Sequence, residues 1–112
     1  MQFLCPLSDI ENYRSKGFCH EDLAFFVVRR NQRAFAYINR CPHMHIPLEW
    51  IPDQFLDYDG ELIQCSTHGA LFTIDKGHCV YGPCHGQALK TLPTEVRGDA
   101  IWIDLGDAAA DL

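Results

Sequence analysis

Two short pairs of cysteine and histidine carry the clearest chemistry in the chain. The first is C-x-H at Cys41 and His43, and the second is C-x2-H at Cys65 and His68. A thiolate and an imidazole in one tight loop supply two ligands to a metal centre. Pro42 cannot continue a strand ladder, and a glycine directly follows the second pair, so we expect both pairs on loops. The four side chains are candidate ligands of one metal site.

A hairpin between the two pairs would bring them together. Residues 55–58 and 61–64 are apolar enough for short strands, and Asp59-Gly60 between them tolerates the positive φ of a two-residue turn. Such a hairpin carries the chain out and back. We therefore expect the two Cys/His loops to meet at one end of a sheet.

The remaining elements are predicted from short apolar runs that recur about every ten residues, with little helical periodicity. This spacing indicates an all-β fold of antiparallel sheets. The expected hairpins pair 25–28 with 34–38, 70–74 with 78–81, and 94–96 with 100–105. The aromatic residues Phe25, Phe26, Phe35 and Tyr37 are expected in the core. A capping box beginning at Ser8 predicts one short helical turn near Asn12 and Tyr13.

Composition limits the class of protein. The chain has 112 residues, with Lys+Arg 9 against Asp+Glu 15, a net charge of −6. This length predicts one domain with a real core but little room for a deep substrate pocket. The acidic balance argues against nucleic acid as a partner. No apolar run approaches the roughly 18 residues that span a bilayer, so no membrane partner is expected.

The expected cellular compartment decides whether the six cysteines form disulfides or remain thiols. Residues 1–9 have neither the basic nor the apolar region of an export signal, so we expect a cytoplasmic protein. Cytoplasmic thiols stay reduced, which favours metal binding or redox work over a disulfide framework.

These motifs together resemble the Rieske 2Fe-2S proteins, and most closely the small soluble Rieske ferredoxins of ring-hydroxylating dioxygenase systems. Besides the Cys/His pairs, the resemblance includes Pro47-Leu48, the strand at Leu71-Phe72, the turn at Gly77, and Gly82-Pro83-Cys84. In the family the last segment is the proline loop, which covers the cluster. The resemblance implies a cluster-binding subdomain over about 40–86, a base sheet from 1–39 and 87–106, and a tail over 107–112.

The resemblance also implies the ligand assignment. Cys41 and Cys65 would bind one iron of a single 2Fe-2S cluster, and His43 and His68 the other. Two neutral imidazoles in place of two thiolates remove negative charge and raise the reduction potential. The histidine-bound iron would therefore accept the electron.

Departures from the respiratory Rieske proteins predict a low potential within the Rieske range. Those proteins join the two ligand loops by a disulfide, and the corresponding positions here are Ile46 and Thr67. They also donate hydrogen bonds to cluster and cysteine sulfurs from a Ser and a Tyr, where this chain has Ala70 and Phe72. Because donors that stabilise the reduced cluster are missing, we expect a potential of about −150 mV.

Several other residues invite a functional interpretation. Adjacent side chains in a strand point to opposite faces, which argues against a second metal site at His78-Cys79 and Cys84-His85. Cys79 and Cys84 are therefore expected to be packing residues, Cys5 and Cys19 to be unpaired thiols, and His45 to be a surface residue. Trp50 follows the Cys41/His43 pair, and two interpretations stay open: it caps the cluster subdomain, or it contacts a partner.

The predicted function is one-electron transfer. By resemblance, a flavin reductase would be the donor and a terminal oxygenase the acceptor. The chain shows no motif for catalysing a substrate reaction alone. Three alternatives remain: a small subunit of an assimilatory nitrite reductase, a zinc-stabilised interaction module, and an iron or redox sensor. The sequence does not indicate an oligomeric state.

Overall fold

The fold consists of three antiparallel sheets, seen in a computed structural model that describes residues 1–42, 46–67 and 69–106. The first sheet has the order β1 (Gln2–Pro6), β10 (Ala100–Ile103), β9 (Thr94–Arg97). The second has the order β2 (Ser15–His20), β3 (Leu23–Arg30), β4 (Arg33–Ile38), β8 (Thr91–Leu92). The third has the order β5 (Ile63–Gln64), β6 (Leu71–Phe72), β7 (Cys79–Tyr81). The all-β antiparallel prediction is confirmed.

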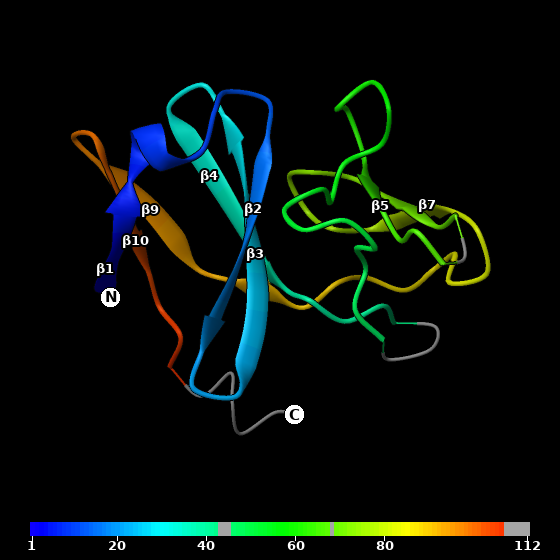
Figure 1. The fold of residues 1–112 in the computed structure, drawn as a ribbon. Coiled ribbons are helices and arrows are strands. Elements are labelled where there is room, and N and C mark those ends of the chain that lie inside the picture. The colour runs from blue at the N-terminus through cyan, green and yellow to red at the C-terminus, as the bar shows by residue number, and fades with distance from the viewer. Residues whose placement is uncertain (43–45, 68, 107–112) are drawn as a thin grey trace.

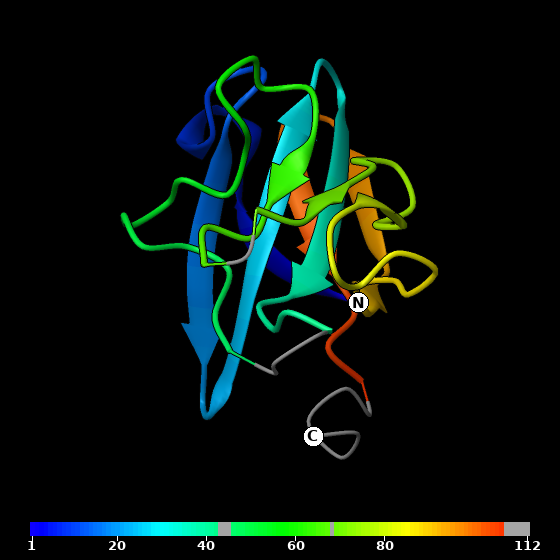
Figure 2. The same cartoon turned by 90° about the vertical axis from the view of Figure 1, so that its right-hand side faces the viewer.

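The four-stranded sheet lies between the other two, as Figures 1 and 2 show. Successive residues of a strand face opposite sides, so a strand buried on both faces is continuously apolar. In β3, Phe25 and Val27 join the core shared with the β1-β10-β9 sheet, whereas Phe26 and Val28 join the core shared with the β5–β7 half. The apolar run of β3 thus contributes to both cores.

Aromatic side chains fasten the β5–β7 half to the central sheet. Phe26 stacks on Phe55 with ring centroids 4.3 Å apart. The Tyr37 hydroxyl donates to the carbonyl oxygen of Ile74, and burial raises the pKa of that phenol, so it stays protonated. Gly77 packs directly on the Tyr37 ring, where an added Cβ would lie 2.7 Å from Cε1. These contacts fix the position of the third sheet.

Three of the predicted hairpins are confirmed, with small changes in strand length. β3 and β4 pair through Arg30 and Arg33, leaving a two-residue turn with Asn31 at φ 55°. β6 pairs with β7, and β9 with β10. The expected core residues Phe25, Phe26 and Tyr37 are buried, and Phe35 packs against the core while partly exposed.

The predicted hairpin over 55–64 is only partly formed. Leu56 bridges Ile63 in the expected register, and the amide of Asp57 donates to the carbonyl of Leu62. The ladder stops there because the Asp57 carboxylate accepts the amides of Glu61 and Leu62. Residues 55–58 therefore form a bridge rather than a strand.

The predicted helical turn near Asn12 and Tyr13 is wrong. The short helix is a 3-10 turn, η1 (Leu7–Asp9), which begins after Pro6 without a side-chain cap. Ser8 lies inside this turn, so it cannot serve as the cap of a capping box. Within the ranges described, no helix is long and apolar enough to cross a membrane. The predicted tail over 107–112 lies outside the described residues.

Candidate metal centre

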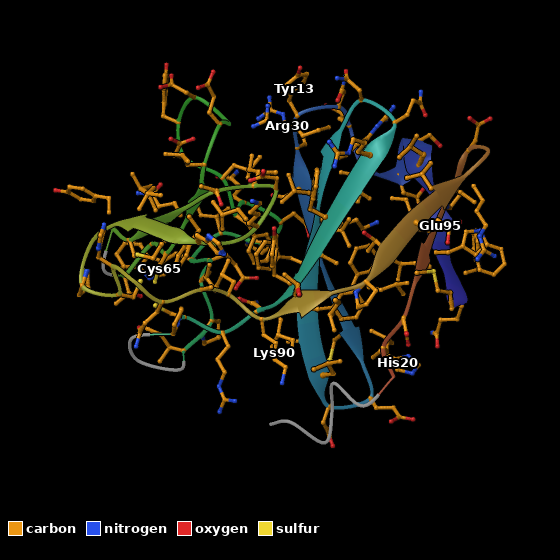
Figure 3. All side chains as sticks on the ribbon, turned by 180° about the vertical axis from the view of Figure 1, so that it is seen from behind. Tyr13, His20, Arg30, Cys65, Lys90 and Glu95 are labelled. Carbon is orange, nitrogen blue, oxygen red and sulfur yellow. The ribbon has the colours of Figure 1, made fainter. Side chains whose placement is uncertain are left out.

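The two predicted cysteine ligands follow two strands of different sheets. Cys41 comes three residues after the end of β4, and Cys65 directly follows β5. Both cysteines are 0% exposed and belong to one core cluster. Neither lies in a strand, which confirms the prediction of loop positions for these two residues. Figure 3 shows Cys65 in the β5–β7 half, across the central sheet from Glu95 of β9.

Each of these loops is closed by a backbone hydrogen bond from its cysteine. The amide of Cys41 donates to the carbonyl of Ile46 at 2.7 Å, and the amide of Cys65 donates to the carbonyl of Ala70 at 2.9 Å. We call residues 41–50 the first ligand loop and residues 65–70 the second. The same closure in both loops fixes the backbone at each cysteine.

The two loops are bound to each other at two points. The amide of Ser66 donates to the carbonyl of Leu48 at 2.8 Å. The indole N–H of Trp50 donates to Thr67 Oγ1 at 3.0 Å, while the Trp50 side chain remains 72% exposed. This side-chain contact ends at Thr67, one of the two positions where the respiratory proteins carry their disulfide. Trp50 therefore links the loops.

Asn39 attaches the first loop region to the central sheet. Its amide N–H donates to the carbonyl of Ala24, its Oδ1 accepts the amide of Leu48, and its Nδ2 donates to Glu49 Oε1 at 2.9 Å. Sequence reasoning missed this residue. The only sequence feature that points to Asn39 is its place directly after a predicted strand, with a side chain that can both donate and accept hydrogen bonds.

The proline loop packs on the second ligand loop. Gly82 lies so close to Ala70 that a Cβ added there would be 2.8 Å from the Ala70 Cα. Gly82 also has φ 106°, a backbone conformation that other residues rarely adopt. Both requirements demand glycine at this position.

Cys84, at the end of Gly82-Pro83-Cys84, is buried beside the first ligand loop. Desolvation by burial, followed by a hydrogen bond to Cys79 and the charges of Cys79 and Cys41, raises the pKa of Cys84 to about 12. The Cys84 thiol is therefore protonated at neutral pH. Cys84 and Cys41 belong to the same buried core cluster.

The predicted histidine ligands His43 and His68, together with His45, lie outside the described residues. Within the described ranges, no three His, Cys, Asp or Glu side chains are grouped closely enough to hold a metal ion. The structure therefore brings the Cys41 and Cys65 loops together and does not describe the other half of the predicted set.

The remaining cysteines and histidines are divided between the two cores and the surface. Cys5 is buried in the core of the β1-β10-β9 half, and Cys19 is exposed. Cys79 and Cys84 are buried, as expected of packing residues, whereas His78 and His85 are exposed. Cys79 and Cys84 also contact each other, which sequence spacing did not indicate.

Three antiparallel sheets and two buried cysteines on joined loops define a small β-protein with two candidate metal ligands. Residues 1–94 match the Rieske [2Fe-2S] domain family. The ferredoxin component of the p-cumate 2,3-dioxygenase system of Pseudomonas putida is 33% identical over 106 residues, which are 92% of this chain and 84% of that protein. This chain therefore belongs to the Rieske [2Fe-2S] domain family.

Two solved structures show a similar fold. The ferredoxin of carbazole 1,9a-dioxygenase from Nocardioides aromaticivorans IC177 superposes with a TM-score of 0.73 at 19% identity, over 92% of this chain and 94% of that chain. A chain in a complex of reduced oxygenase and oxidised ferredoxin of carbazole 1,9a-dioxygenase gives a TM-score of 0.73 at 22% identity, over 90% of this chain and 89% of that chain.

The cofactor of this family is a Rieske-type 2Fe-2S cluster with cysteine and histidine ligands. The described residues fit such a group. Cys41 and Cys65 present thiols from buried positions on loops joined to each other, and Gly82 of the proline loop packs on Ala70 of the second ligand loop. Thiolates are the ligands that iron–sulfur clusters require.

The contact between Trp50 and Thr67 can be tested by replacing each partner. Trp50→Phe keeps an aromatic ring but removes the donor, so we expect a loss of about 1 kcal/mol in unfolding free energy and faster loss of the cluster. Thr67→Val removes the acceptor and should have a similar effect. The double variant should be no worse than either single variant, measured by chemical unfolding and by decay of visible absorbance. Additive losses would show that the contact does not link the loops.

Ala70→Ser tests the expectation of a low potential. A hydroxyl that donates to the reduced cluster with a preference of about 1 kcal/mol would raise the one-electron potential by about 40 mV. Protein-film voltammetry measures this change directly. Ala36→Ser is the matched control, because Ala36 is a buried alanine in the other core. An unchanged or lowered potential in cluster-loaded Ala70→Ser would contradict the expectation.

Proposed function

We propose that this protein is a one-electron carrier that receives an electron from a flavin-dependent reductase and passes it to a terminal oxygenase. The observation that carries the proposal is the pair of buried cysteines on mutually bonded loops, in a chain of the Rieske [2Fe-2S] domain family. The relatives support the same direction of transfer. One is the ferredoxin component of a dioxygenase system, and another is a ferredoxin in complex with an oxygenase.

Within this proposal, Cys41, His43, Cys65 and His68 hold the cluster. The cluster supplies a centre that gains and loses one electron without a change of ligands. Residues 40–86 form the cluster-binding subdomain, with 1–39 and 87–106 as the base. The cytoplasm, where thiols stay reduced, is the compartment that suits these ligands.

The chain's own residues keep the site rigid and dry on the cysteine side. Hydrogen bonds from the amides of Cys41 and Cys65 hold each loop closed, and Asn39 attaches the first loop to the central sheet. Gly82 allows the proline loop to approach the backbone of Ala70. A rigid site favours fast electron transfer, because little has to move when the charge changes.

A reconstituted electron-transfer assay tests the proposal. NADH, a flavin reductase from a ring-hydroxylating dioxygenase system and catalytic amounts of this protein should reduce an oxidised terminal oxygenase, followed by stopped-flow absorbance. Omission of this protein is the control. The carrier proposal is wrong if the reductase reduces it but no oxygenase reoxidises it, a result that favours a sensor. A stable association with a nitrite reductase subunit instead would favour the alternative drawn from that family.

The rate of reduction or reoxidation by a protein partner should fall as salt is raised. The net charge of −6 favours a partner with a basic docking face. Raising salt from about 0.01 M to about 1 M shortens the Debye length from about 30 Å to about 3 Å, so we expect at least a roughly tenfold drop in the second-order rate. Reduction by a small neutral mediator is the control and should change little. A partner rate that rises with salt would refute electrostatic steering.

A further inference from the structure

Cys79 and Cys84 form a pair of thiols beside the proposed cluster site. The Cys84 thiol donates to Cys79 Sγ with the two sulfurs 3.0 Å apart, and the Cys79 thiol donates to the carbonyl of Tyr81 at 3.3 Å. Cys79 is 5% exposed and Cys84 is 1% exposed. The two sulfurs are therefore held in contact in the core.

The backbone around the two cysteines keeps this contact in place. The amide of Cys79 donates to the carbonyl of Gln87 at 2.9 Å, and the amide of Gln87 donates to the carbonyl of Cys84 at 2.8 Å. The main chain of Gln87 thus forms hydrogen bonds with the main chains of both cysteines. Gly82 and Gly86, both at positive φ, allow the segment between them to turn back on β7.

The separation of the two sulfurs is close to that of a disulfide. A disulfide bond is about 2.0 Å long, so the sulfurs need to approach by only about 1 Å. The other cysteines are placed differently. Cys5 lies in the other core, Cys19 is exposed, and Cys41 and Cys65 are the proposed ligands.

We propose that Cys79 and Cys84 are a reversible disulfide site, which hydrogen peroxide oxidises while the protein keeps its fold. The proposal rests on the sulfur contact and the backbone that holds it. It does not depend on the proposed transfer of electrons to an oxygenase.

The reaction is balanced with peroxide as the oxidant. Cys79, the more exposed of the two, gives up its proton, and its sulfur attacks one peroxide oxygen. The O–O bond breaks, the oxygen attached to sulfur keeps its hydrogen as a sulfenic acid, and the leaving hydroxide takes the Cys79 proton to become one water. Cys84 Sγ then attacks Cys79 Sγ, the S–O bond breaks, and the hydroxide leaves with the Cys84 proton as a second water. The two thiols lose two electrons in all, and peroxide gains them.

The disulfide would join β7 to the proline loop. That loop packs on Ala70 of the second ligand loop, and Cys84 lies in the same buried core cluster as Cys41. Oxidation would thus fasten the covering loop against the proposed cluster site. We expect the oxidised protein to lose its cluster several-fold more slowly during exposure to a chelator.

Mass spectrometry of the holoprotein tests the proposal. The protein is treated with graded hydrogen peroxide, unreacted thiols are blocked, and only samples that retain visible absorbance are digested. We expect the intact mass to fall by two hydrogen atoms, a peptide in which Cys79 and Cys84 are joined, and recovery of both thiols with dithiothreitol. Oxygen added to either cysteine without the joined peptide, or two unmodified thiols at a dose that oxidises Cys19, would overturn the proposal.

Two variants sharpen the test. Cys19→Ser should form the same joined peptide, because Cys19 is exposed and remote from the pair in the core. Cys84→Ala should lose no hydrogen atoms and should accumulate oxygen on Cys79. A mass loss that persists in folded Cys84→Ala would contradict the pairing. If Cys84→Ala does not fold, the wild-type peptide map decides the question alone.

Discussion

Substitution of Cys65 or Cys41 by serine is expected to leave the purified protein without its cluster. Each thiolate would be an iron ligand, and loss of even an outer partner of a metal site costs roughly 10- to 100-fold in affinity. The loss of a direct ligand should therefore reduce iron and acid-labile sulfide per chain to background. His43→Ala and His68→Ala should have the same effect. Metal analysis and visible absorbance measure it.

Matched controls separate ligand loss from general damage. Cys19→Ser removes an exposed cysteine, and Cys5→Ser removes a buried cysteine in the core of the β1-β10-β9 half. His20→Ala removes an exposed histidine of β2. All three should keep the cluster. A brown, fully loaded Cys65→Ser protein, or a colourless Cys19→Ser protein, would contradict the ligand assignment.

Gly82→Ala is expected to be strongly destabilising and to disturb the cluster site. Its Cβ would lie 2.8 Å from the Cα and 3.1 Å from the Cβ of Ala70, and backbone cannot swing aside as a long side chain can. Overpacking and strain at φ 106° together should cost about 2–4 kcal/mol in unfolding free energy. We also expect partial cluster loading, because the proline loop would be pushed away from the second ligand loop.

Gly86→Ala is the matched control for this prediction. Gly86 has φ 92°, but an added Cβ there meets no atom within 4 Å. It should therefore show only the cost of the backbone strain, about 1–2 kcal/mol, with normal cluster loading. Chemical unfolding and iron content measure both variants. Equal losses at the two glycines would show that the contact with Ala70 contributes nothing.

The parts of the fold that could be predicted are those with a local cause. Consecutive apolar residues predict that β3 is buried. Gly98 next to Asp99 predicts the turn between β9 and β10. The loop positions of Cys41 and Cys65 follow from the residues beside them. In each case a short window of sequence contains the whole physical reason.

The parts that could not be predicted depend on contacts between distant residues. β1 pairs with β10, so Phe3 meets Trp102 near the other end of the sequence. Asp57 ends a predicted strand because its carboxylate accepts the Leu62 amide, which the ladder would use, together with the neighbouring Glu61 amide. Local pattern cannot indicate which of these competing hydrogen bonds forms.

The site shows the same division. The sequence identified Cys41 and Cys65 as candidate ligands, since their spacing to histidine is local. It did not indicate that Trp50 bonds Thr67, that Asn39 bonds the amide of Leu48, or that Cys84 contacts Cys79. These contacts join segments that only the tertiary fold brings together.

The most direct test of the central claim is the visible absorption spectrum of freshly purified protein before and after dithionite, with iron, sulfide and zinc measured on the same sample. Our account predicts a brown protein that contains iron and acid-labile sulfide and bleaches on reduction. A colourless protein that holds zinc after gentle anaerobic preparation, and does not respond to dithionite, would contradict it and favour a zinc-stabilised interaction module.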